Sequence, residues 1–288
     1  MKEVIALRYR RLGTTGEFLP IVGQGTWKLE QADYEQARRS ILSGIDAGMT
    51  HLDTAEDYGK GRAEELLGRI LLARRDDVFL TSKVHPDHAT RAADVRAACH
   101  ASCRRLGTDR LDLYLLHWPG DASLEECVTA FRSLQQEGAI RHWGVSNFSL
   151  QDLDHLARLS PRGEAACNQI FYHLAERRIE HRVLPRGDRM GLSTIAYSPL
   201  GSGVFPPPGH PGNPVLERIA RCHGASTAQV ALAWLARHDS IMLLARSYRP
   251  EHTLANAASA DLRLTPADVG SLDAAYPAAP YDGLLPTR

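Results

Sequence analysis

Short apolar segments recur along the chain at intervals of roughly 25 to 35 residues, enough for one helix and two loops between neighbours. Eight such segments cover residues 20–25, 50–53, 77–83, 111–117, 140–146, 166–172, 192–198 and 240–246. Most of them are apolar at consecutive rather than alternate positions, which is typical of parallel strands covered on both faces. The pattern therefore predicts eight buried parallel strands.

The segments between these strands carry the period of an amphipathic helix. Residues 34–45 hold apolar side chains three or four positions apart, and Gly48 follows where a helix would end. Similar stripes cover 63–70 and 124–134, and the Ser-Thr-Ala-Gln run at 226–229 has the form of a capping box. Eight alternations of strand and helix favour a closed barrel over an open sheet.

Two regions depart from this alternation. Residues 8–20 predict a short hairpin at the bottom of the barrel, and the proline-rich residues 204–214 predict an irregular loop after the seventh strand. No internal repeat or linker interrupts the sequence. We expect an α/β protein with one (β/α)₈ (TIM) barrel domain over residues 1–288, an N-terminal β-hairpin and a short C-terminal tail.

Composition excludes several classes of partner. Lys plus Arg equals Asp plus Glu, at 34 each, so the charge favours neither nucleic acid nor an anionic membrane. No apolar run is long enough for a signal peptide or a membrane span. Five scattered cysteines indicate reduced thiols rather than a disulfide framework (Cys99, Cys103, Cys127, Cys167 and Cys222). We expect a cytoplasmic monomer that acts on a small molecule.

Four reactive side chains follow consecutive predicted strands. Asp53 ends the second strand, Tyr58 lies five residues later, Lys83 ends the third strand and His117 ends the fourth. Active sites of (β/α)₈ barrels form at the carboxyl ends of the strands, so these side chains should converge on one rim.

These four side chains would make a general acid suited to a carbonyl oxygen. The ordinary pKa of a phenol is about 10, and a nearby ammonium lowers the pKa by stabilising the phenolate. Asp53 would keep a buried Lys83 charged, and His117 would donate a hydrogen bond to the carbonyl. Taken singly, Asp53 fits a turn cap, Lys83 a solvated strand end and Tyr58 a surface aromatic. Their conjunction at one rim favours the catalytic interpretation.

Ordered motifs along most of the chain resemble the aldo-keto reductase superfamily. They are HLDTAEDYG at 51–59, LTSKV at 80–84, DLYLLHWP at 112–119, GVSNF at 144–148, NQ at 168–169 and AYSPLG at 196–201. Among its members, the chain looks most like small bacterial methylglyoxal and general aldehyde reductases. The resemblance implies reduction of aldehydes or ketones to alcohols by hydride transfer from NADPH. Tyr58 would be the proton donor of a tetrad completed by Asp53, Lys83 and His117.

The resemblance also implies a binding site for the nicotinamide half of the cofactor. Tyr197 would stack on the nicotinamide, and Ser146, Asn147 and Gln169 would hold its carboxamide. The remaining cofactor positions on this side are Gly25, Thr26, Asp53, Ser198, Leu200 and Ser202, of which the last three would line the pyrophosphate. The substrate pocket would be lined by Trp27, Tyr58, His117 and Trp118.

The adenosine 2′-phosphate site departs from the family pattern. Arg246 and Ser247 match the expected phosphate contacts, Tyr248 is available to stack on adenine, and Asn256 matches an adenine contact. His252 stands where a second arginine is usual and would be largely neutral at pH 7. We therefore expect NADP(H), gripped more weakly than in typical members, with NAD(H) as a second cofactor.

Three other classes of protein fit a barrel of this kind. A metal-dependent hydrolase usually has His-x-His at an early strand end, whereas this chain has His51-Leu-Asp53 and no further ligand pair, so we expect no metal. A non-catalytic NADP(H)-binding barrel, acting as a sensor or regulatory subunit, would not need the complete tetrad, and neither would a purely structural barrel. The substrate stays open among small aldehydes such as methylglyoxal, aryl aldehydes, keto-sugars and larger ketones, since loops set specificity on this scaffold.

Overall fold

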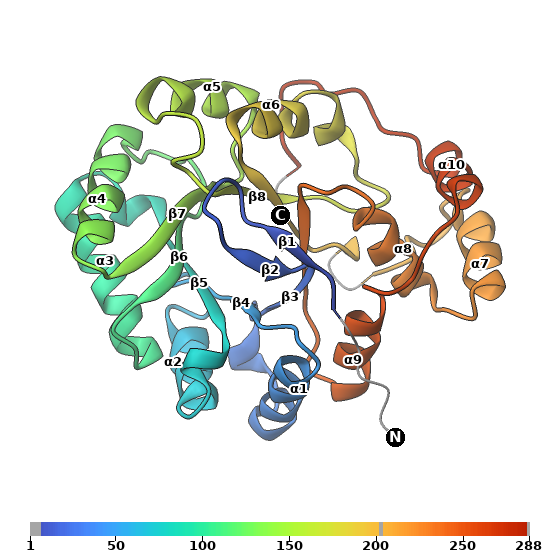
Figure 1. The fold of residues 1–288 in the computed structure, drawn as a ribbon, viewed down its shortest axis with the longest axis horizontal. Coiled ribbons are helices and arrows are strands. Elements are labelled where there is room, and N and C mark those ends of the chain that lie inside the picture. The colour runs from blue at the N-terminus through green and yellow to red at the C-terminus, as the bar shows by residue number, and fades with distance from the viewer. Residues whose placement is uncertain (1–6, 202–203, 287–288) are drawn as a thin grey trace.

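The structure, a computed structural model, describes residues 7–201 and 204–286. Its centre is a closed barrel of eight parallel strands in the order β10-β3-β4-β5-β6-β7-β8-β9 (Figure 1). The strands are β3 (Val22–Gly25), β4 (His51–Asp53), β5 (Phe79–Val84), β6 (Leu111–Leu116), β7 (Ile140–Ser146), β8 (Cys167–Phe171), β9 (Ser193–Tyr197) and β10 (Ile241–Ala245). Each of the eight strand predictions is confirmed, as is the (β/α)₈ fold.

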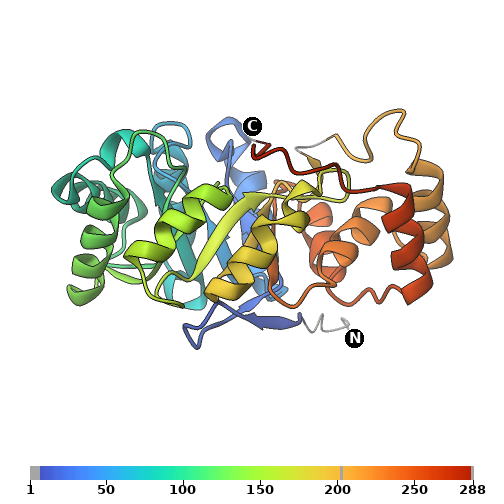
Figure 2. The same cartoon turned by 90° about the horizontal axis from the view of Figure 1, so that it is seen from above.

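Helices surround the barrel on its outer side (Figures 1 and 2). They are α1 (Tyr34–Asp46), α2 (Arg62–Leu71), α3 (Ala92–Leu106), α4 (Leu124–Gln136), α5 (Leu150–Leu159), α6 (Val183–Met190), α7 (Asn213–Cys222), α8 (Thr227–Leu235), α9 (Pro250–Ala258) and α10 (Pro266–Ala275). The predicted capping box forms at α8, where the Ser226 side chain accepts from Gln229 N and the Gln229 side chain accepts from Ser226 N. Among the described residues, no helix is both long and apolar enough to span a membrane.

The barrel has separate inner and outer apolar cores. Along β6, Tyr114 and Leu116 pack outward against the helices, while Leu113 and Leu115 face a small inner cluster with Ile195. This inner cluster extends through the barrel from Phe79 and Cys167, which begin their strands, to Leu115 and Leu244, which lie one residue before the ends of theirs.

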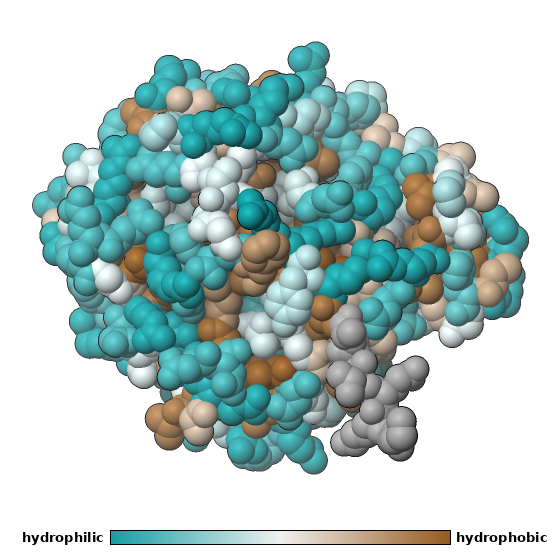
Figure 3. All heavy atoms as spheres, in the orientation of Figure 1, coloured by the Kyte–Doolittle hydropathy of each residue, from teal (hydrophilic) through white to brown (hydrophobic). Residues whose placement is uncertain are grey.

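The predicted hairpin closes the bottom of the barrel (Figure 2). Strands β1 (Tyr9–Arg11) and β2 (Phe18–Pro20) pair antiparallel, and Leu12 and Leu19 join the inner cluster. Gly13 adopts a φ of +51° and lies so close to the barrel that a Cβ would be 2.6 Å from Ala166 O. A larger residue at position 13 would push the hairpin off the barrel. On this face, polar side chains predominate and apolar ones are scattered (Figure 3).

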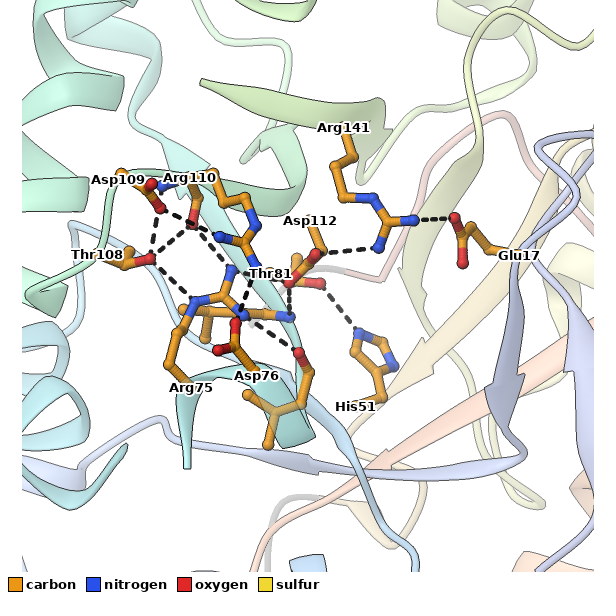
Figure 4. A network of polar contacts seen from close by, with 12 residues as sticks. Glu17, His51, Arg75, Asp76, Thr81, Thr108, Asp109, Arg110, Asp112 and Arg141 are labelled. Atoms are coloured by element: carbon orange, nitrogen blue, oxygen red, sulfur yellow. Dashed lines mark hydrogen bonds and ion pairs between the residues drawn. The ribbon is translucent and has the colours of Figure 1, made fainter. Parts of the chain in front are cut away.

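A polar network around Asp112 joins this hairpin to the lower ends of the strands (Figure 4). One Asp112 carboxylate oxygen accepts from Arg75 Nη2 at 2.9 Å and from Leu80 N at 2.8 Å. The other accepts from Arg141 Nη1 at 3.3 Å, and Arg141 also pairs with Glu17 of the hairpin. Asp112 is buried, so removing one of these partners would leave hydrogen-bonding capacity unfilled inside the protein.

Replacing Asp112 should destabilise the barrel strongly. Asp112→Ala leaves Arg75 without its buried partner and Leu80 N–H without an acceptor, so we expect unfolding to become easier by about 3 kcal/mol. Urea denaturation followed by circular dichroism measures this change. Asp109→Ala is the matched control: Asp109 pairs with Arg110 on the surface, and its loss should cost less than about 0.5 kcal/mol. Equal effects of both variants would contradict a stabilising role for the network.

Candidate active site

The four predicted reactive residues meet at the carboxyl rim of the barrel. Asp53 ends β4, Lys83 precedes the last residue of β5, and His117 directly follows β6. Tyr58 lies in the turn between β4 and α2, held by a hydrogen bond from Tyr58 N to Ala55 O. Parallel pairing of β4 with β5 and of β5 with β6 brings these strand ends side by side.

Lys83 is the centre of the group. Its Nζ donates to Asp53 Oδ1 at 2.6 Å, to Thr54 O at 2.8 Å and to the Tyr58 hydroxyl at 3.1 Å. The side chain is fully buried, and an ammonium has three protons to donate. All three are therefore satisfied, and one is directed at the phenol.

Burial determines the protonation of this pair. Burial raises the pKa of Tyr58 above its usual value, and the charge of Lys83 only partly opposes that rise. Burial alone would lower the pKa of Lys83, but Asp53 and Tyr58 outweigh it and raise that pKa. Lys83 is thus an ammonium and Tyr58 a neutral phenol at neutral pH. The sequence predicted the direction in which Lys83 acts on Tyr58, but the prediction of a lowered pKa was wrong because burial is the larger effect.

His117 is a neutral imidazole beside Tyr58. The two ring centroids lie 5.7 Å apart at an interplanar angle of 72°. Burial lowers the pKa of His117 well below its usual value, and Lys83 and His85 lower it further. Nδ1 is buried without a hydrogen-bond partner among the described residues. An unpaired buried acceptor costs less than an unpaired buried N–H, so the proton belongs on Nε2.

The residues expected around the nicotinamide connect directly to this group. Gln169, in β8, donates from Nε2 to Asp53 Oδ2 at 2.7 Å. Asn147 donates from Nδ2 to His117 O at 3.0 Å and to Ser146 Oγ at 3.1 Å, and it accepts from the Tyr197 hydroxyl at 2.8 Å. Asn147 has a φ of 58°, a left-handed conformation that asparagine tolerates better than most residues. The structure brings this predicted set together.

Other predicted cofactor residues lie along the same rim. Gly25 ends β3 opposite Asp53, and Thr26 donates to Asp53 O from both its backbone N and its Oγ1. Ser198, with a φ of 48°, and the half-buried Leu200 follow β9. Ser202 lies outside the described residues.

The residues predicted to bind the adenosine half of the cofactor follow β10, and two of them, Arg246 and Tyr248, contact Trp27. The Arg246 guanidinium lies 5.4 Å from the ring centroid of Trp27 and 5.6 Å from that of Tyr248. The Tyr248 hydroxyl donates to Trp27 O at 2.9 Å. Tyr248, expected beside adenine, is thus hydrogen-bonded to the loop after β3, at Trp27, which was predicted to line the substrate pocket.

The other three residues of the predicted adenosine site lie on or just before α9. Ser247 Oγ accepts from Arg249 N at 3.1 Å, which fixes the turn into the helix. His252 is exposed and Asn256 is buried on this helix. His252 and the guanidinium of Arg246 thus remain accessible to a phosphate.

Sequence reasoning missed one ring at this rim. His85 lies 4.7 Å from Trp118, ring centroid to centroid, and Trp118 lies 4.7 Å from His117. The signal was its position two residues after Lys83, since alternate residues of a strand share a face. Two hollows of about 470 and 550 Å³ lie elsewhere, along α5 and α6, and include none of the predicted residues.

Comparison with known proteins identifies the class that this fold and site define. The aldo/keto reductase family profile matches residues 21–277. This chain therefore belongs to the aldo/keto reductase family, and the resemblance found in the motifs is confirmed.

Two relatives and one crystal structure give the extent of the similarity. The methylglyoxal reductase YeaE of Escherichia coli (strain K12) is 42% identical over 262 residues, covering 90% of this chain and 92% of the relative. The glyoxal reductase of Bacillus subtilis (strain 168) is 31% identical over 262 residues, covering 90% of each. A crystal structure of an aldo/keto reductase from Klebsiella pneumoniae in complex with NADP and acetate matches with a TM-score of 0.92 and 38% identity, covering 98% of this chain and 100% of that chain.

Proposed function

We propose that this chain is an NADP(H)-dependent reductase of small aldehydes and ketones in which Tyr58 is the general acid. The observation that carries the proposal is the contact of Lys83 Nζ with both Asp53 and the Tyr58 hydroxyl in a buried site. The similarity to an enzyme named methylglyoxal reductase supports a small carbonyl substrate, with methylglyoxal as the first to test.

The residues at the rim fit a nicotinamide cofactor. An aromatic ring at Tyr197, the amides of Asn147 and Gln169, and a cation at Arg246 are the groups that a nicotinamide, its carboxamide and a 2′-phosphate require. Two similar Klebsiella pneumoniae structures contain NADP or NADPH. NADP(H) is the preferred cofactor in this proposal, and NAD(H) is the weaker alternative because His252 replaces a second arginine.

Each residue of the tetrad has a distinct task in the reaction. When bound, NADPH supplies a hydride to the carbonyl carbon. His117 donates from Nε2–H to the carbonyl oxygen and fixes its orientation, while Tyr58 gives its hydroxyl proton to the same oxygen. Lys83 stabilises the phenolate left behind, and Asp53 holds Lys83 in place and charged.

The proposal extends to the state of the protein in the cell. We take residues 1–288 as a single domain that works as a cytoplasmic monomer. The cysteines of the chain are free thiols, and four of the five are buried, which is compatible with a reducing compartment.

Removing the phenolic proton should abolish most of the activity. Tyr58→Phe keeps the ring and removes the donor, so kcat for methylglyoxal reduction should fall at least about 100-fold. NADPH affinity, measured by quenching of tryptophan fluorescence, should stay within about two-fold. Near-full carbonyl reduction by this variant would assign proton transfer to another group. A wild-type protein that binds NADPH but reduces no carbonyl would instead support the sensor alternative.

Removing the cation should weaken the acid. Lys83→Met takes away the charge that favours the phenolate, so the pKa of Tyr58 should rise further and reduction should slow across neutral pH. The measurement is kcat/KM for methylglyoxal between about pH 6 and pH 10. Lys60→Met is the control, because Lys60 lies two residues from Tyr58 but is exposed. An unchanged profile in Lys83→Met would contradict the role of Lys83.

Cofactor preference should depend mainly on Arg246. A charged hydrogen bond to phosphate is worth roughly 1.5–3 kcal/mol, or about 10- to 150-fold in affinity. Arg246→Ala should weaken NADPH binding by that order and leave NADH binding nearly unchanged, since only NADPH carries the 2′-phosphate. His252→Arg should tighten NADPH selectively. Equal loss of both cofactors in Arg246→Ala would mean that the 2′-phosphate is bound elsewhere.

A further inference from the structure

The proposed proton donor is the first of four aromatic rings in contact along the rim. Tyr58 lies against His117, His117 lies against Trp118, and Trp118 meets the ring of His85 edge to face at 79°. His85 is close enough to His117 to lower the pKa of that imidazole. The ring of His85 thus belongs to the same wall as the residues that would bind the reacting carbonyl.

His85 is held from two sides. Its backbone N–H donates to Glu56 Oε1 at 2.6 Å, and the Glu56 side chain is itself buried. Its ring Nδ1 accepts from Asp87 N at 3.2 Å, within the turn that starts the 3₁₀ helix Pro86–His88. An imidazole that accepts through Nδ1 carries its proton on Nε2 in the neutral form. The hydrogen bond at Nδ1 therefore fixes the ring and leaves Nε2 as its donor, since the Asp87 carboxylate, 3.6 Å from Nδ1, lies beyond hydrogen-bond distance.

This donor has no protein partner among the described residues. Each hydrogen bond and ion pair found for the His85 ring within residues 7–201 and 204–286 uses Nδ1. The side chain is 24% exposed, so Nε2 is not sealed in the core.

We propose that His85 is a specificity-determining residue whose Nε2–H binds a second oxygen of the substrate, on the carbon next to the reacting carbonyl. This inference rests on the proposed function. His117 would hold the oxygen that accepts the proton, and His85 would hold the neighbouring one. The pocket would thereby favour 2-oxoaldehydes over aldehydes whose adjacent carbon carries only hydrocarbon. The role is one of recognition, and proton transfer stays with Tyr58.

The test compares two substrates of similar size in matched variants. Methylglyoxal carries the second oxygen, and 2-methylpropanal replaces it with a methyl group. His85→Phe keeps a ring against Trp118 but removes the donor, whereas His85→Gln keeps an N–H donor. His88→Phe is the control, because His88 ends the 3₁₀ helix that His85 caps, also contacts Glu56, and is 60% exposed.

Loss of a single hydrogen bond should lower kcat/KM for methylglyoxal about 3- to 10-fold in His85→Phe. The value for 2-methylpropanal should stay within about two-fold, since that substrate makes no such bond. His85→Gln should recover part of the preference, and His88→Phe should retain all of it. Hydration of each aldehyde is the same for every variant and cancels when variants are compared.

An equal loss of kcat/KM for both substrates in His85→Phe would overturn the inference. His85 would then only pack against Trp118. An unchanged preference for methylglyoxal over 2-methylpropanal in His85→Phe would overturn the inference as well. If His85→Phe melts at a much lower temperature than the wild type, His85→Leu provides the same comparison without a second ring. A wild-type protein that reduces neither aldehyde would refute the proposed function, an outcome distinct from an active enzyme indifferent to the change at His85.

Discussion

The buried ion pair of Lys83 with Asp53 is the interaction on which the rest of the rim depends. Two charges withdrawn from water are tolerated only if their hydrogen-bonding capacity is filled. Asp53 meets this condition through Lys83 from β5 and Gln169 from β8, while its backbone oxygen accepts from Thr26. The same carboxylate thus joins strands on opposite sides of the barrel, and the position of the acid is tied to the closure of the sheet.

The polar groups at the lower end of the barrel stabilise the fold, whereas those at the upper end form the candidate active site. At the lower end, Asp112 is surrounded by arginines, and Arg10 of the hairpin donates to Ala236 O and Ile241 O at 2.5 Å each. The protein itself supplies the ion-pair and hydrogen-bond partners of Asp112 and Arg10. At the upper end, His117 Nδ1 is unpaired and Nε2 of His85 has no partner in the described chain. Unfilled hydrogen-bonding capacity beside the tetrad is what a binding site requires.

The strands and the tetrad could be predicted because both follow from the order of apolar and polar residues along each strand. Apolar runs mark the strands, and a polar residue that ends such a run must lie at the rim, which located Asp53, Lys83 and His117. The pKa of Tyr58 could not be predicted in the same way. Its net direction depends on how much solvent the fold removes, and residue types alone do not give that quantity. The geometry of the loops could not be predicted either, because it depends on contacts between distant parts of the chain. The hydroxyl of Tyr248, for example, donates to the backbone oxygen of Trp27, 221 positions away.

The raised pKa of Tyr58 also bears on the tolerance of the protein to alkali. A buried phenol that keeps its proton in the folded state binds that proton more tightly than the unfolded chain does. Stability from this source is complete below the pKa of the unfolded chain, about 10, and declines as the pH rises towards the folded value. Each such phenol then favours unfolding by about 1.4 kcal/mol per pH unit across that interval. Tyr114, buried in the outer core with its pKa raised in the same way, adds to the effect. The desolvation that keeps the acid protonated therefore also lowers the stability of the fold in alkali.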